Sequence, residues 1–353
     1  MAITKIPAAG FTGNNFRNII INGDMSIAQR GTSTSGCTTS GYYACDRWDT
    51  NISSLGTWTI SQSTDVPSGQ GFANSMKWDC TTADASPAST DNIIIQQHIE
   101  GQNLQYLKKG TSSAESITFS FWIKSNKTGT YTVQLRDIDN ARHISKEFTI
   151  SSADTWEKKT LTFAGDTTGA FDNDNAKSLQ LDIYLGAGSN FTSGTLASSW
   201  SSYTQANTAP NNVNLADSTS NYINITGLQL EAGTTASDFE FLPYDVNLKR
   251  CQRYFISNRS GANLLGCAVF TAASFNTNEA WGSNPFPVYM RASPSITIYT
   301  IAQVAGSADR FGGGTAVCAA VLIHPSGFSA LNGSGTFTSS RIYGCTYEAT
   351  AEL

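Results

Sequence analysis

The segments ITFSFWIK, from Ile117 to Lys124, and YTVQLRD, from Tyr131 to Asp137, decide the fold class of this 353-residue chain. Apolar and polar residues alternate in them with a period of two, as in a β-strand that buries one face. Asp139-Asn140 then separates the second segment from Ile144 to Ile150, and this spacing predicts a hairpin turn. Together these segments predict antiparallel β structure.

Similar strand-like segments recur at short intervals up to about Gly233, with turn residues between them. The clearest are Glu157 to Phe163, Leu179 to Leu185 and Tyr222 to Leu230. Many short strands joined by turns predict an all-β fold, a β-sandwich for which we expect a jelly roll. We expect the long polar excursion from Gly186 to Asn221 to be pinned to this sandwich by its few apolar side chains.

The composition agrees with turn-rich β structure. Only 14% of the residues are charged, whereas 11% are aromatic and 30 are glycine. The formal net charge is -5 and no run of Lys or Arg could follow a phosphate backbone, so nucleic acid is not an expected partner. The first residues lack a signal-peptide pattern, and the longest apolar run, Ala316 to Ile323, is too short to span a bilayer. We therefore expect a protein made in a cytosol, without membrane insertion.

The pattern changes near Asp245, where DVNLKRCQRYF predicts a short helix with one apolar side. We expect an extended lead-in over 1–17, a jelly-roll sandwich over 18–244, and the short helix plus a smaller C-terminal β domain over 245–353. The strands predicted in the last domain are Asn263 to Phe270, Pro294 to Ile301, Ala316 to Ile323 and Arg341 to Ala351.

Signatures of catalysis and of metal binding are weak. The sequence has no GxSxG, Walker A, GxGxxG or HExxH motif, so we expect no enzymatic activity. Asp172 and Asp174 in the turn FDNDNA are weak calcium candidates, and no other cofactor is expected. The seven cysteines show no CxxC spacing and are expected to be mostly buried small hydrophobes.

Aromatic residues supply the candidate ligand contacts, because sugar rings stack on exposed aromatic faces. Trp122 and Trp156 lie within or just before strands, and we expect them in the core. Two loop-like clusters are the better candidates for glycan contacts, and they comprise Trp200 with Tyr203, and Trp281 with Phe275 and Tyr289.

Several stretches, in this order, resemble a recurring type of phage and prophage tail protein. They are NIIINGDMSIAQRG (18–31), YYACDRWD (42–49), ITFSFWIKSN (117–126), YINITGLQLEAG (222–233), FEFLPYDVNLKRCQRYF (239–255), FPVYMRASPSITIY (286–299) and YEATAEL (347–353). The central region is also similar to the jelly-roll carbohydrate-binding modules attached to glycoside hydrolases. Most of these strings have a structural interpretation, in which Asn22 to Asp24 form a turn and Arg47 pairs with an acidic neighbour.

The resemblance implies a virion protein, commonly trimeric, with no catalytic residue to carry over. Our main hypothesis is a homotrimeric tail fibre or tip adhesin that attaches to other virion proteins by its N-terminal segment. Its β domains would bind a bacterial surface polysaccharide or lipopolysaccharide, with avidity from trimerisation. Two alternatives stay open: a capsid decoration or head-fibre protein without a receptor, and a polysaccharide depolymerase.

Overall fold

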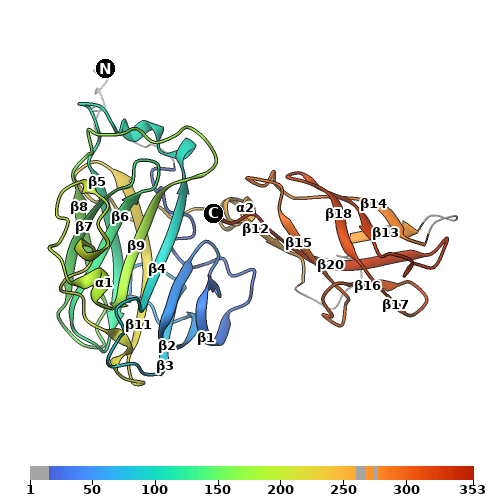
Figure 1. The fold of residues 1–353 in the computed structure, drawn as a ribbon, viewed down its shortest axis with the longest axis horizontal. Coiled ribbons are helices and arrows are strands. Elements are labelled where there is room, and N and C mark those ends of the chain that lie inside the picture. The colour runs from blue at the N-terminus through green and yellow to red at the C-terminus, as the bar shows by residue number, and fades with distance from the viewer. Residues whose placement is uncertain (1–15, 260–267, 273–276) are drawn as a thin grey trace, which may run out of the picture.

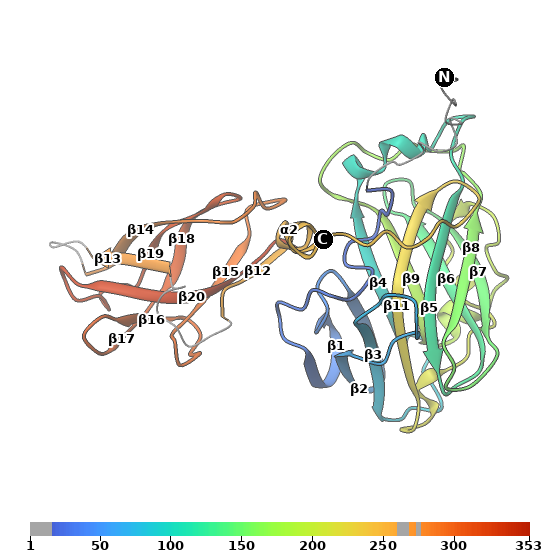
Figure 2. The same cartoon turned by 180° about the vertical axis from the view of Figure 1, so that it is seen from behind.

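The computed structural model describes residues 16–259, 268–272 and 277–353, and it consists of two β-sheets with a short helix between them (Figures 1 and 2). One sheet has eleven strands and the other has nine. The all-β class predicted from the alternating segments is therefore confirmed. Of the predicted lead-in, only Phe16 and Arg17 belong to the described residues.

The eleven-stranded sheet folds over on itself at β2 (Asp49–Ser63). Residues 49–54 of β2 pair with β4 (Asn92–Glu100), and residues 57–63 pair with β3 (Ser75–Thr82). Ser54 and Gly56 mark the corner, with φ values of 53° and 74°. The remaining strands of the sheet are β1 (Ser33–Tyr42), β5 (Ile117–Ser125), β6 (Gly129–Asp137), β7 (Arg142–Ile150), β8 (Glu157–Phe163), β9 (Lys177–Ala187), β10 (Ser201–Ser202) and β11 (Tyr222–Ala232).

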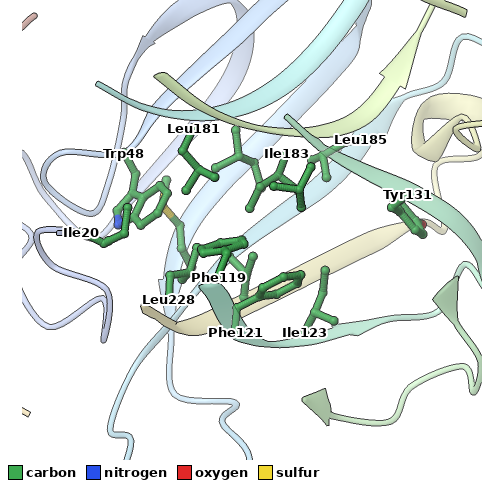
Figure 3. Close-up of a cluster of buried hydrophobic side chains, with 14 of the residues drawn as sticks. Ile20, Trp48, Phe119, Phe121, Ile123, Tyr131, Leu181, Ile183, Leu185 and Leu228 are labelled. Carbon is green, nitrogen blue, oxygen red and sulfur yellow. The ribbon is translucent and has the colours of Figure 1, made fainter. Parts of the chain in front are cut away.

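The fold-over creates two layers that enclose one core. The first layer runs β10-β7-β6-β9-β4 to the first part of β2, and the second runs from the rest of β2 through β3-β11-β5-β8. Figure 3 shows Phe119 and Phe121 of β5 facing the leucines and isoleucine of β9 across this core. The Phe121 ring lies 5.1 Å from that of Phe148 in β7. Fully burying such side chains stabilises the sandwich by about 1.5–3 kcal/mol each.

All six strand segments named for this sandwich in the sequence are strands, and the predicted hairpin connects β6 to β7. The excursion from Gly186 to Asn221 is pinned to the sandwich as expected, since Phe191 and Leu215 are buried. It contains α1 (Ser189–Thr192), η4 (Gln205–Asn207) and η5 (Leu215–Asp217) besides β10. Two further single turns, η2 (Gly101–Asn103) and η3 (Gln105–Leu107), follow β4.

The expectation that Trp122 and Trp156 belong to the core is wrong. The core-facing positions of β5 include Phe119, Phe121 and Ile123. Trp122 lies between two of them, so its side chain points outward and is partly exposed. Trp156 is also partly exposed, and its Nε1 donates a hydrogen bond of 3.0 Å to a carboxylate oxygen of Asp65. The tryptophans that are fully buried in this core are Trp48, Trp58 and Trp78.

The predicted helix is confirmed as α2 (Tyr244–Gln252), and it leads into the nine-stranded sheet. The strands of this sheet are β12 (Phe255–Ser257), β13 (Ala268–Ala272), β14 (Glu279–Pro285), β15 (Ser295–Tyr299), β16 (Ser307–Arg310), β17 (Thr315–Val317), β18 (Ala319–His324), β19 (Gly327–Asn332) and β20 (Ile342–Thr350). Its own apolar cluster includes Phe270, Met290, Phe328, Leu331 and Tyr343.

Two of the strands predicted here are confirmed, because β15 and β20 fall within Pro294 to Ile301 and Arg341 to Ala351. The single strand predicted over Ala316 to Ile323 is wrong. This segment is divided between β17 and β18, which lie at opposite ends of the sheet order and are separated only by Cys318, so the two ends of the sheet meet at this residue. The prediction over Asn263 to Phe270 lies partly outside the described residues.

Among the described residues, no helix combines the length and the apolar character needed to cross a membrane. Five cysteines, Cys37, Cys45, Cys80, Cys251 and Cys318, are buried and form no disulfide, and Cys345 is buried as well. Cys267 lies outside the described residues.

Candidate functional site

A polar groove of about 340 Å³ lies on the outer face of the layer formed by β2, β4, β9 and β6. The strand register determines which side chains form the floor of the groove, because residues paired across neighbouring strands point to the same face of the sheet. Asp49 of β2 pairs with Gln96 of β4, which pairs with Asp182 of β9. The next row along the strands contains His98, Gln180 and Arg136.

The local sequence explains why polar side chains gather here. In β9, Leu179, Leu181, Ile183 and Leu185 point into the core, so Gln180 and Asp182 must point to the opposite face. An outer sheet face of this kind is normally solvated, yet Asp182 has an exposed fraction of only 1%. The outer face is therefore covered around its edges, and the groove is what stays open.

The excursion between β9 and β11 supplies one wall of the groove, with Phe191 and Tyr203. The Arg136 guanidinium lies over the Tyr203 ring, 3.9 Å from its centroid. That ring also meets His143 edge-on, with the centroids 5.2 Å apart. Arg136 and Tyr203 thus form a cationic and aromatic pair at one side of the groove.

Two buried polar atoms in the groove have no hydrogen-bond partner within the described parts of the chain. They are Nε of Arg136 and Oδ1 of Asn92. Leaving a buried donor or acceptor unpaired costs about 1–3 kcal/mol, so such groups in a native fold call for an explanation.

The groove also holds two carboxyl groups whose pKa values are raised. Burial raises the pKa of Asp182 to about 6, against hydrogen bonds that its Oδ1 accepts from Gln96 Nε2 at 2.7 Å and Gln180 Nε2 at 2.8 Å. Burial and the nearby charge of Glu352 raise the pKa of Asp49 to about 6. Burial lowers the pKa of Lys177 in the same groove. The charge of the groove therefore changes near pH 6.

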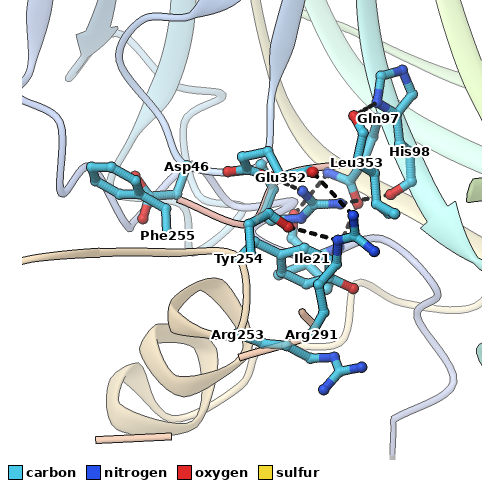
Figure 4. Close-up of polar contacts among 12 residues, drawn as sticks. Ile21, Asp46, Gln97, His98, Arg253, Tyr254, Phe255, Arg291, Glu352 and Leu353 are labelled. Atoms are coloured by element: carbon cyan, nitrogen blue, oxygen red, sulfur yellow. Dashed lines mark hydrogen bonds and ion pairs between the residues drawn. The ribbon is translucent and has the colours of Figure 1, made fainter. Parts of the chain in front are cut away.

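The C-terminal residues contact His98 beside the groove and join the two domains (Figure 4). His98 Nδ1 lies 2.8 Å from the backbone oxygen of Leu353, and burial lowers the pKa of His98 to about 3. Glu352 pairs with the buried Arg47, whose guanidinium lies 3.6 Å from the centroid of the Tyr254 ring. Arg47 does pair with an acidic side chain, but the partner comes from the far end of the chain and is not a neighbour in the sequence.

A second set of contacts strengthens the same junction. Arg253 donates two hydrogen bonds to the Glu100 carboxylate, at 2.8 and 2.7 Å. The Tyr254 hydroxyl donates to the same carboxylate at 2.5 Å. In the smaller domain, Arg291 Nη1 donates to the backbone oxygen of Asn175 at 2.8 Å. These contacts fix α2 and the smaller domain against the edge of the sandwich.

The predicted ligand residues are not brought together as two clusters. Tyr203 lines the groove, whereas Trp200 packs against the sandwich core and donates from Nε1 to the Ala164 oxygen at 2.8 Å. Trp281 and Tyr289 are 48% and 60% exposed in the smaller domain, with no ring contact between them in the described structure. Phe275 lies outside the described residues.

The weak calcium candidates Asp172 and Asp174 are exposed in the turn before β9. Asp174 Oδ1 accepts a hydrogen bond from the Ala176 amide at 2.9 Å, which is the structural role expected of Asp in a turn. Within the described ranges, no group of three or more His, Cys, Asp or Glu side chains could hold a metal ion.

Sequence reasoning missed Asp49, Gln96, Arg136 and Asp182. A signal was available in β9, where Gln180 and Asp182 alternate with apolar residues, whereas in β4 the alternation is broken by Ile94 and Gln97. The sequence does not show the strand register. The register joins Asp49, Gln96 and Asp182 into one row, although they are separated by 47 and 86 positions in the chain.

No protein-family model and no curated protein matches this chain. Solved structures with similar folds include a tailspike protein of bacteriophage CBA120 (14% identity, 61% of this chain and 21% of that chain, TM-score 0.32). Another is a putative sugar-binding protein from Bacteroides thetaiotaomicron (14% identity, 61% and 99%, TM-score 0.34). A third is a family 11 carbohydrate-binding module from Clostridium thermocellum in complex with a mixed-linked tetrasaccharide (14% identity, 58% and 98%, TM-score 0.27). The match spans about a fifth of the tailspike chain.

Proposed function

We propose that this chain binds a bacterial surface polysaccharide or lipopolysaccharide in the polar groove of the sandwich. The observation that supports this proposal is the row of amide and carboxyl side chains on the floor of the groove, with the Arg136 guanidinium and the Tyr203 ring at its side. Sugar hydroxyls both donate and accept hydrogen bonds, so they match a row of amide and carboxyl side chains such as Gln96, Gln180 and Asp182. The Tyr203 ring adds an aromatic surface beside that row.

The test compares binding of the intact protein and its variants to an array of bacterial capsular polysaccharides and lipopolysaccharides. We expect saturable binding to at least one of them, and at least a tenfold loss in Arg136→Met, which keeps apolar packing on Tyr203 but removes the guanidinium. Asp174→Asn, in an exposed turn, is the matched control and should bind as the unchanged protein does. Equal binding by Arg136→Met would overturn the assignment of the groove.

We further propose that the chain is a phage tail fibre or tip adhesin located in the virion. The support is the ordered series of sequence stretches that resembles phage tail proteins. Four of these stretches meet at the junction of the two domains, where they contribute Arg30, Arg47, Tyr254 and Glu352. In this proposal the shared strings preserve the joint between the sandwich and the smaller domain, while the groove is free to vary with the glycan.

A homotrimer is part of the same proposal, and the smaller domain offers an apolar surface for it. Ile342 of β20 pairs with Thr271 of β13, which pairs with Trp281 of β14. Phe311 extends this row, since its amide donates to the Ile342 oxygen at 3.0 Å. Phe311, Ile342 and Trp281 are each 40–48% exposed. Exposed apolar stripes of this kind mark protein–protein contacts.

Light scattering after size-exclusion chromatography tests this assembly. We expect three times the 37.7 kDa chain mass, and dissociation in the variant Trp281→Ser/Ile342→Ser. A monomeric unchanged protein at micromolar concentration would contradict the trimer. A trimer that binds no glycan on the array would favour the alternative of a capsid decoration or head-fibre protein.

The depolymerase alternative gains one specific observation. Asp49 and Asp182 flank Gln96 on neighbouring strands, so their Cα atoms are separated by two strand spacings, or about 9–10 Å. Both side chains point to the outer face of the sheet, and a pair of carboxyl groups at one site is what a glycosidase requires. Release of reducing ends from a bound polysaccharide, abolished in Asp182→Asn, would favour this alternative over simple binding.

A further inference from the structure

A second hollow, of about 180 Å³, lies on the opposite outer face of the sandwich, over β11, β5 and β8. Trp122 occupies its centre in the sheet, because it pairs with Thr226 of β11 on one side and Lys158 of β8 on the other. Since Trp122 is partly exposed, its indole ring is available to a ligand. This face lies across the core from the polar groove.

A glycine opens the hollow beside this ring. The register of β11 shifts between Thr226 and Gln229, and Gly227 in this bulge has a φ of 65°. A Cβ at Gly227 would lie 2.6 Å from Cζ of Phe72, so a side chain would collide with the ring that borders the hollow. The bulge thus leaves space on the sheet surface where a residue in regular β structure would project a side chain.

Three phenylalanines form the wall of the hollow. The rings of Phe72, Phe239 and Phe241 lie 4.8–5.1 Å from one another, which fixes them as a unit. The segment that carries Phe239 and Phe241 is anchored to β11, because the Glu240 amide donates to Gln229 Oε1 at 2.8 Å. The wall is therefore built before any ligand arrives.

Polar side chains surround this aromatic surface and are not used by the fold. Gln70, Lys158 and Asp238 line the hollow, and their side chains make no hydrogen bond or ion pair with any described residue. They offer an amide, an ammonium and a carboxylate at different points of the rim. A single charge type would suit an ion, whereas this mixture suits a neutral ligand with several hydroxyl groups.

We propose that the hollow over Trp122 is a second binding site, for a single neutral pyranose ring of a glycan. The C–H face of the ring would stack on the indole, and its hydroxyls would reach Gln70, Lys158 and Asp238. The volume of about 180 Å³ is below the roughly 300–1,000 Å³ of sites that enclose a whole small molecule, so one ring fits and an oligosaccharide does not. With the polar groove, one chain would contact glycan on two opposite faces.

The direct test follows the indole N–H signals of tryptophan in the full-length protein by NMR. The seven tryptophans give one indole signal each, and Trp122→Phe assigns the signal of interest. The probes are the methyl α- and β-pyranosides of glucose, galactose and mannose. We expect a saturable shift of the Trp122 signal with at least one of them, with a dissociation constant on the order of 1–10 mM. Asp238→Ala should weaken this binding at least threefold.

Two control variants distinguish binding at the hollow over Trp122 from binding elsewhere on the protein, including the polar groove. Trp156→Phe removes another partly exposed indole near the same layer and should leave the Trp122 shift unchanged. Arg136→Met should also leave it unchanged, even if array binding is lost, so failure of the groove and failure of this site are separate results. The inference is overturned if no probe up to about 100 mM shifts the Trp122 signal, or if Asp238→Ala binds as well as the unchanged protein.

Discussion

Replacing Asp182 by asparagine should stabilise the sandwich at alkaline pH and leave its stability unchanged at acidic pH. Burial raises the pKa of Asp182 from an ordinary value near 3.9 to about 6. A folded-state pKa above the unfolded value gives a contribution to stability that is fully present below about pH 4 and is lost as pH rises through 6. Two units of pKa correspond to about 3 kcal/mol, which is the largest gain expected from Asp182→Asn at pH 8.

The substitution is conservative in shape and in hydrogen bonding. Gln96 and Gln180 both donate to Oδ1 of Asp182, and an asparagine oxygen in that position accepts both bonds. The assay is urea unfolding at pH 4 and at pH 8, followed by the fluorescence of the buried tryptophans of the sandwich. Asp174→Asn removes an exposed carboxylate and should leave the free energy of unfolding unchanged at both pH 4 and pH 8. Destabilisation by Asp182→Asn at pH 8, or an equal effect at both pH values, would refute the reasoning.

Three further perturbations probe the junction, the second hollow and the groove. Glu352→Ala leaves the charge of Arg47 buried and should lower the free energy of unfolding by about 3–5 kcal/mol in urea titrations. Gly227→Ala forces a side chain into a left-handed conformation against Phe72, and should cost more than about 1 kcal/mol in the same assay. Because burial lowers the pKa of His98 to about 3, its contribution to stability is lost as pH falls below about 6.5, so His98→Gln should flatten the fall in melting temperature between pH 6 and pH 4.

Two of these perturbations have a matched comparison in the chain. Glu115→Ala removes the exposed partner of Lys108 and should cost at most about 1 kcal/mol, so an equal loss from Glu352→Ala would contradict its special role. Gly69→Ala tests a positive φ with no atom within 4 Å of the added Cβ, and a cost as large as that of Gly227→Ala would remove the steric explanation. An unchanged pH profile in His98→Gln would show that other groups dominate acid destabilisation.

The strands of the sandwich could be predicted because their cause is local. In β5, every second side chain points into the core. These side chains include Phe119, Phe121 and Ile123, so the alternation can be recognised in the sequence. The same alternation places Trp122 on the outer face, so the expectation of a buried Trp122 ignored a signal that the segment itself contains. In β4 the outer positions are also buried, because other parts of the chain cover them, and the period-two pattern is correspondingly weak.

The groove could not be predicted in the same way, because its cause is long-range. Asp49 and Asp182 look like ordinary surface carboxyls in their own segments, and only the register through Gln96 places them in one row. Tyr203 was named as a ligand candidate for its loop-like surroundings, and the structure does place it at the groove. Trp200 had the same surroundings and packs against the core instead. Trp281, from the other loop-like cluster, lies in β14. Loop-like sequence thus predicts neither that a residue lies outside the strands nor the direction in which its side chain points.

The polar side chains of the groove lower the stability of the fold, so their presence needs a physical explanation. A buried carboxyl group such as Asp182 lowers stability at neutral pH, and an apolar residue on this covered face would remove that penalty. Arg136, whose Nε has no hydrogen-bond partner among the described residues, adds a second unfavourable group in the same place. The contacts that hold the two domains together use other carboxyl groups, Glu100 and Glu352. The polar row of the groove therefore costs stability without serving the junction, and a polar ligand that bound there would offset this cost, which is the physical reason for proposing that this face of the sandwich binds a ligand.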